Sequence, residues 1–210
     1  MRHGQSCAAN GGSSGLVWLE RQRTGAVGHR RGEGLPRMLF GDFLVIGGPE
    51  VAREAGDATL LDFAAQCEAM LEAGPPIISS IMGLYPDHFV TRMKANGIKW
   101  FATATTVTEA KAAVDAGADV IIAQGMEAGG HRGVFDATKA EARLVGLFSL
   151  LPAVADAVKV PVVAAGGIDD GRGLAAALLL GASAVQVGTA FLRCPEAKVS
   201  GAWADAIGLS

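Results

Sequence analysis

The sequence has few cysteines and lacks any hydrophobic run long enough to cross a bilayer. Its three cysteines, Cys7, Cys67 and Cys194, are odd in number and widely spaced. They form neither a disulfide framework nor a zinc-binding pattern, which favours a reducing, cytoplasmic compartment. A transmembrane helix needs about 20 consecutive apolar residues, and every apolar run in this chain is far shorter. A membrane-spanning protein is therefore excluded.

Hydrophobic residues and glycine, in contrast, are abundant. Of the 210 residues, 50% are hydrophobic and only 19% are charged, which is enough apolar material for a sizeable core. Glycine supplies 29 residues without a collagen-like period, about twice its ordinary usage. Such an excess indicates many tight turns, or backbone that lies close to a ligand.

Charge divides the chain into two parts. Residues 1–40 hold six Arg, no Lys and two Glu, a net charge of +4, whereas residues 41–210 hold 12 basic and 19 acidic residues, a net charge of −7. The first part has no apolar core of a secretory signal, and is interpreted as an irregular basic leader, with a transit peptide or a nucleic-acid arm as alternatives. The acidic second part argues against nucleic acid as the main partner. We therefore expect one folded domain over residues 41–210.

From residue 60 onward, short β-branched runs alternate with alanine-rich stretches of helical spacing. Glycines 97, 117 and 181 follow three of the predicted helices and are typical helix stops. The predicted strands cover residues 76–82, 98–104, 119–124, 160–165 and 183–187. The predicted helices cover residues 60–73, 86–95, 108–116, 147–158 and 173–180.

The spacing of these elements indicates an α/β fold. Most strand starts are separated by one strand plus one helix with short loops, and the long interval after residue 124 leaves room for a functional loop. The strands are continuously apolar, as expected for a parallel sheet covered on both faces. Periodicity alone does not separate an open doubly wound sheet from a closed barrel.

The loop after the third predicted strand carries the first candidate site. Residues 124–133 contain four glycines and His131. Histidine is the side chain best suited to proton transfer near neutral pH, and loops after the carboxyl ends of parallel strands carry the chemistry in such folds. A glycine-rich turn whose histidine only caps a neighbour is the structural alternative.

The loops after the last two predicted strands resemble phosphate sites. Residues 165–170 and 186–190 each combine glycine with a following helical turn, and Thr189 adds a hydroxyl donor. Two such loops in consecutive units form the recurrent phosphate site of barrel enzymes. A phosphate beside a base suggests FMN or pyridoxal phosphate, and the absence of a lysine at a strand end disfavours the second.

Three motifs together resemble the nitronate monooxygenases, formerly called 2-nitropropane dioxygenases. These are AQGMEAGGHRG at residues 123–133, PVVAAGGIDDGRG at 161–173 and AVQVGTAF at 184–191. The resemblance runs from about residue 60 to 195. It implies an FMN-binding (β/α)8 TIM-type barrel that oxidises alkyl nitronates, or the parent nitroalkanes, with oxygen to a carbonyl compound and nitrite.

The resemblance also implies roles for single residues. His131 would be the catalytic base, and Gln124, Gly129 and Gly130 would contact the flavin. The ribityl phosphate would be held by Gly166, Gly167, Gln186, Val187, Gly188 and Thr189.

The chain departs from the family pattern at both ends. The family's first strand, with its Pro-Met segment, has no counterpart in residues 1–40, so about five of the eight βα units are expected here, with exposed sheet edges through which chains would associate. Two alternatives stay open. One is an FMN-dependent enoyl-acyl-carrier-protein reductase, against which Arg132 argues modestly. The other is an inactive barrel fragment.

Overall fold

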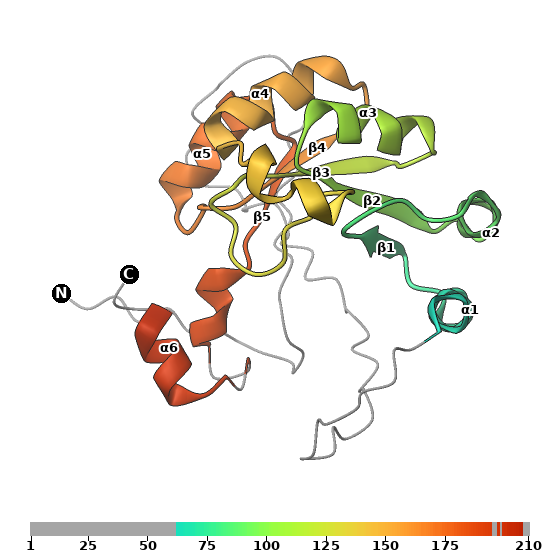
Figure 1. Cartoon of the computed structure of the whole chain (residues 1–210), viewed down its shortest axis with the longest axis horizontal. Coiled ribbons are helices and arrows are strands. Elements are labelled where there is room, and N and C mark those ends of the chain that lie inside the picture. Colours follow the sequence, from blue (N-terminus) through green and yellow to red (C-terminus); the bar gives the residue numbers. More distant parts are fainter. Residues whose placement is uncertain (1–61, 195–196, 198, 208–210) are drawn as a thin grey trace, which may run out of the picture.

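The computed structural model describes residues 62–194, 197 and 199–207, in which helices and parallel strands alternate (Figure 1). The last strand is followed by a 3₁₀ helix, η3 (Thr189–Arg193), and then by a short α-helix. The strands are β1 (Ile77–Ser80), β2 (Lys99–Ala104), β3 (Val120–Gln124), β4 (Val162–Ala165) and β5 (Ala184–Gln186). The α-helices are α1 (Phe63–Ala73), α2 (Asp87–Ala95), α3 (Val107–Asp115), α4 (Leu147–Ala157), α5 (Gly171–Leu179) and α6 (Gly201–Ile207).

All five strands run parallel in one sheet, and their order in space is their order in the chain, β1-β2-β3-β4-β5. A doubly wound sheet reverses its strand order at a switch point, whereas a barrel does not. The described sheet contains no reversal, and Figure 1 shows α3, α4 and α5 along one side of it. The order therefore resolves the ambiguity left by the sequence in favour of five consecutive units of a barrel-type sheet.

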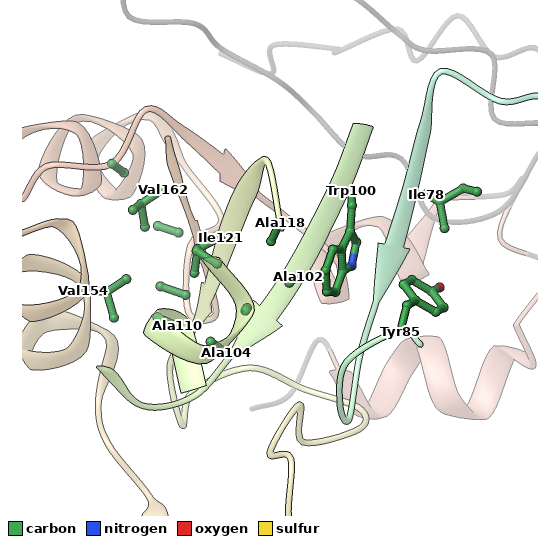
Figure 2. Close-up of a cluster of buried hydrophobic side chains, with 14 of the residues drawn as sticks. Ile78, Tyr85, Trp100, Ala102, Ala104, Ala110, Ala118, Ile121, Val154 and Val162 are labelled. Carbon is green, nitrogen blue, oxygen red and sulfur yellow. The ribbon is translucent and has the colours of Figure 1, made fainter. Parts of the chain in front are cut away.

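Alternate residues of each strand enter two separate hydrophobic clusters. On β2, Trp100 and Ala102 belong to the larger cluster, which also contains the buried residues of the helices, whereas Phe101 belongs to the smaller one. Figure 2 shows part of the larger cluster, with Ile121 of β3 facing Val154 of α4. The smaller cluster contains only strand residues. Both faces of the strands are thus apolar, which explains why their sequences do not alternate.

An aromatic group packs α1 and α2 against the first two strands. Trp100 is fully buried, its ring centroid lies 5.6 Å from that of Tyr85, and its Nε1 donates to Ser80 Oγ at 3.0 Å. The Tyr85 hydroxyl donates to the Ser79 carbonyl at 2.8 Å, and burial raises the pKa of Tyr85 to about 12. Both polar atoms of these large side chains are therefore satisfied inside the core.

Ten predicted elements are present, each with ends shifted by only a few residues. Asp62 and Thr106 cap α1 and α3 with their side chains, and α5 begins two residues before its predicted start because Asp170 caps it. Helix α6 was not predicted, since its seven residues are too few for a periodic signal.

Several predictions lie outside the described residues. They include the basic leader over residues 1–40 and the position of Cys7. The proposed domain boundary at residue 41 stays a prediction for the same reason. In the part of the chain that the structure describes, no helix is both long and apolar enough to span a membrane.

Asp119, just before β3, ties together the amino-terminal ends of the strands. One carboxylate oxygen accepts from Lys94 Nζ at 2.6 Å and from the Trp100 N–H at 2.9 Å, and the other accepts from Lys99 Nζ at 3.3 Å. Burial by itself would raise the pKa of Asp119, but the hydrogen bonds from Lys94, Trp100 and Lys99 hold it below its usual value. The carboxylate therefore stabilises the fold in its charged form.

We expect Asp119→Ala to lower the free energy of unfolding by about 1–3 kcal/mol, because the Trp100 N–H loses its acceptor. The change is measured by denaturant unfolding, with Asp115→Ala, an exposed position on α3, as the control expected to stay within about 0.5 kcal/mol. Since the folded pKa is depressed, the difference from the unmodified protein should be complete above about pH 4 and shrink as the pH falls further. Equal effects of the two substitutions would contradict this role.

Candidate active site

The loops after β3, β4 and β5 meet at the carboxyl edge of the sheet, because these three strands are adjacent and parallel. The first loop is long and runs from Gly125 to Gly146, the residue that precedes α4. It includes two short 3₁₀ helices, η1 (Ala137–Lys139) and η2 (Glu141–Arg143). The strand order thus brings together the three segments that the sequence predicted to form one site.

These loops are in direct contact, and glycine makes the contact possible. A β-carbon on Gly166 would lie 2.9 Å from the Ala128 nitrogen, and one on Gly129 would lie 2.7 Å from Thr189 Oγ1. Gly166 also has a φ of +112°, a conformation that favours glycine. The β3 loop is therefore seated against both of the predicted phosphate loops.

The side chain of Gln124 holds the loop that carries His131. Gln124 ends β3 and is buried; its Nε2 donates to the His131 carbonyl at 3.0 Å and its Oε1 accepts from the Gly133 N–H at 2.7 Å. Both polar ends of the amide are thus used within the protein. Gln124 shapes the loop, a role that its predicted contact with a cofactor did not include.

His131 has a fixed backbone and an exposed side chain. The neighbouring glycine at 130 is also exposed and has a φ of +77°. Gly133 lies against β2, where a β-carbon would come within 2.6 Å of Thr103 Cγ2. The loop is therefore anchored on either side of an imidazole that is accessible to a small molecule.

Arg132 closes the long loop by joining its two ends. Its Nη1 donates to the Gly125 carbonyl at 2.8 Å and its Nη2 to the Arg143 carbonyl at 3.3 Å. Burial lowers the pKa of the guanidinium, while the charges of Glu109 and Glu127 act in the opposite direction. Within the described residues, Arg132 Nε is buried without a hydrogen-bond partner. From the sequence, Arg132 served only as an argument against the reductase alternative, and its role in holding the loop was not predicted.

Glu127 caps α4 from a distance of 20 residues in the chain. The N-cap residue of this helix is Gly146, which offers no side chain, and the Leu147 N–H instead donates to the two carboxylate oxygens of Glu127 at 3.0 and 2.9 Å. The same side chain lies beside the β4 loop, since a β-carbon on Gly167 would be 3.1 Å from Glu127 Cβ. The local sequence contains no signal for this long-range cap.

The two predicted phosphate loops differ at the helices that follow them. Asp170 accepts from the N–H groups of Arg172 and Gly173 at 2.9 and 3.0 Å, and the hydrogen bonds from Gly173 and from the Arg172 side chain lower its pKa. A negative charge thus already occupies the amino-terminal end of α5. In contrast, η3 begins after Gly188 with no side-chain cap. The first N–H groups of α5 are thus already used by Asp170, and phosphate binding by the two loops stays a prediction.

Four further predicted residues lie along the same edge. Thr189 and Gly188 are exposed, and a β-carbon on Gly188 would meet no atom within 4 Å. Val187 is half-buried against the main core, which is a packing role. Gln186 Oε1, in the part of the chain that is described, is buried and has no hydrogen-bond partner. None of the described residues thus supplies the donor that a buried acceptor ordinarily has.

Comparison with known proteins identifies a family. A family model described as nitronate monooxygenase matches residues 48–209. The chain is 48% identical over 138 residues to a nitronate monooxygenase from Pseudomonas aeruginosa, covering 66% of this chain and 39% of that protein. It is 43% identical over 145 residues to a probable nitronate monooxygenase from Staphylococcus aureus, covering 69% and 41%. The chain therefore spans about two-fifths of the length of the curated relatives that it matches.

Solved structures give a consistent comparison. A nitroalkane oxidase from Streptomyces ansochromogenes matches with a TM-score of 0.66 and 42% identity, covering 69% of this chain and 42% of that one. FabK from Thermotoga maritima matches with a TM-score of 0.58 and 35% identity, covering 70% and 44%. The arrangement of the five strands is thus shared with enzymes of the barrel class.

Proposed function

Because the chain belongs to the nitronate monooxygenase family, we propose that it takes part in the oxidation of alkyl nitronates or nitroalkanes by oxygen, with FMN as the cofactor. The observation that carries this proposal is an exposed histidine on a loop whose backbone is fixed by Gln124 and which lies against two glycine turns. A base beside an anion-binding edge is what deprotonation of a small acidic substrate next to a phosphorylated cofactor requires.

The residues at the site fit FMN. Gly166, Gly167, Gly188, Thr189 and Val187 would hold the phosphate through a backbone that carries little side-chain bulk. The orphaned Oε1 of Gln186 would accept from an N–H or O–H group of the cofactor. Gln124, Gly129 and Gly130 would lie beside its ring system. When bound, FMN would supply the redox chemistry that no side chain provides.

His131 would act on the proton of the substrate. The imidazole would remove the proton from the carbon that bears the nitro group of a neutral nitroalkane, and it would orient a nitronate that is already an anion. The fixed backbone would limit the positions open to the imidazole, since Gln124 and Arg132 hold the residues around it. Only the neutral substrate requires the base, which makes the role separable by experiment.

We expect His131→Asn to reduce turnover of neutral nitroalkanes by about 10²–10⁴-fold, and that of nitronate anions much less. Nitrite release by the FMN-loaded chain is the measurement. His88→Asn, an exposed position on α2, is the matched control and should leave both rates unchanged. Equal losses on the two substrate forms would indicate that His131 has only a structural role.

Gly188→Val should weaken FMN binding by at least about tenfold without loss of stability, because the added side chain enters open space in the chain itself but faces the proposed phosphate. Quenching of FMN fluorescence measures the dissociation constant. Gly171→Val is the control: its β-carbon also meets no atom, and it lies at the end of α5 that Asp170 already caps. Unchanged binding by Gly188→Val would remove the β5 loop from the site.

The same FMN-loaded protein distinguishes this function from the two alternatives, a reductase and an inactive barrel fragment. A reductase would consume reduced nicotinamide and release no nitrite. An inactive fragment would stay colourless after incubation with FMN. The similarity to the nitroalkane oxidase has the higher TM-score and identity, which favours oxidation. The cytoplasmic location predicted from the cysteine usage stays a prediction.

We also propose that the chain associates with itself through the sheet edges. Within the described residues, β1 pairs only with β2 and β5 only with β4, and exposed Ile81, Met82 and Leu84 follow β1. An apolar, unpaired edge favours strand-to-strand association.

The double substitution Ile81→Lys and Met82→Lys should therefore lower the sedimentation coefficient of the associated chain to that of the monomer. Leu179→Lys, at an exposed position on α5, is the control and should leave association unchanged. A monodisperse monomer in the unmodified protein would refute the proposal.

A further inference from the structure

Glu109 is a buried carboxylate in the first turn of α3, and the site described above does not yet use it. The residue is only 4% exposed. The pattern Thr106-Val-Thr-Glu109 is that of a capping box, in which the glutamate would bond to the N–H of the cap residue. Thr106 does accept from the Glu109 N–H at 3.2 Å. Half of the box is thus present, whereas the carboxylate accepts from the N–H of Thr105, one residue before the cap.

The contacts of the carboxylate extend further than a cap. Its Oε2 accepts from both the N–H and the hydroxyl of Thr105 at 2.8 Å. Its Oε1 accepts from the N–H of Phe135 at 3.0 Å, 26 residues along the chain, and lies 3.7 Å from Arg143 Nη1. One carboxylate thus joins the turn after β2 to the long loop after β3.

Phe135 lies four residues beyond His131. Gln124 holds the loop at the His131 carbonyl and the Gly133 N–H, and Glu109 holds it at the Phe135 N–H. The segment that carries the histidine is thereby fixed by one side chain from β3 and one from α3. Both side chains are buried, so their hydrogen bonds are shielded from competing water.

We propose that Glu109 is a positioning residue for His131, which acts by holding the loop at Phe135. The proposal rests on the proposed role of His131 as a base. A carboxylate suits the task because each of its oxygens accepts from a different segment. A glutamine has one acceptor oxygen, so its NH₂ group would face an N–H donor on one of the two sides, at Thr105 or at Phe135. Glu109→Gln therefore breaks the link between these two segments whichever way its amide is turned.

Amide hydrogen exchange on the full 210-residue chain tests the loop contact without any activity. We expect Glu109→Gln to speed exchange over residues 131–136 by about tenfold or more, relative to the amides of β2 and β3. The matched control is Thr105→Val, which removes one hydrogen bond to the same carboxylate but leaves the Phe135 contact. It should leave exchange in this segment unchanged. No change in Glu109→Gln, or an equal increase across the sheet, would overturn the proposal.

If Glu109→Gln does not fold, hydrogen exchange of the unmodified chain tests whether the Phe135 amide is held. The Phe135 amide should exchange much more slowly than in an unstructured peptide. Exchange at the unstructured rate would overturn the proposal.

Kinetic measurements distinguish positioning of His131 from a general stabilisation of the fold. In the FMN-loaded protein, Glu109→Gln should lower turnover of neutral nitroalkanes by about ten- to a hundredfold, with smaller losses on nitronates and an unchanged FMN dissociation constant. Equal losses on both substrate forms would overturn the positioning role. If the unmodified chain releases no nitrite, the proposed function fails, and hydrogen exchange alone decides whether Glu109 orders the loop.

Discussion

Close backbone packing between three loops is the constraint on which the rest of the site depends. The β3 loop touches the β4 loop at Gly166 and the β5 loop at Thr189, at distances that leave no room for a β-carbon. Such packing requires adjacent parallel strands whose carboxyl ends share one edge, and it requires glycine at the points of contact. Glycine is therefore required where these loops meet, whereas Gly74, Gly97, Gly117 and Gly181 form the turns that end helices.

Polar side chains fix the loops that glycine allows to pack closely. Glycine allows close approach but costs conformational entropy, and the long loop after β3 contains several. Gln124, Arg132 and Glu127 compensate by joining the loop to itself and to α4. None of these three side chains is the proposed base. These three side chains fix the backbone of the loop, while the imidazole of His131 stays exposed and free of such contacts in the described residues.

Much of the fold could be predicted from the sequence because apolar runs and glycine stops are local signals. The five strands follow from short, continuously apolar runs and the helices between them from a period of 3.6 residues, and the strand order then places the three motifs at one edge. The Asp170 cap is also a local signal, since the aspartate directly precedes the helix that it caps. The contacts of Glu109 and Glu127 could not be predicted, because each reaches 20 or more residues along the chain. Helix α6 was too short to give a pattern.

The sequential strand order also has a consequence for how the chain folds. Pairing joins Ile77 to Lys99, 22 residues apart, but Ile121 to Val162, 41 residues apart. Each unit can dock on the one before it, as in a linear array whose steps close short loops at a modest entropic cost. The step from β3 to β4 is the exception, because it must close the loop that carries His131. The two halves of the sheet are thus joined across the least local connection, so that the polar contacts which order this loop also bring the halves together during folding.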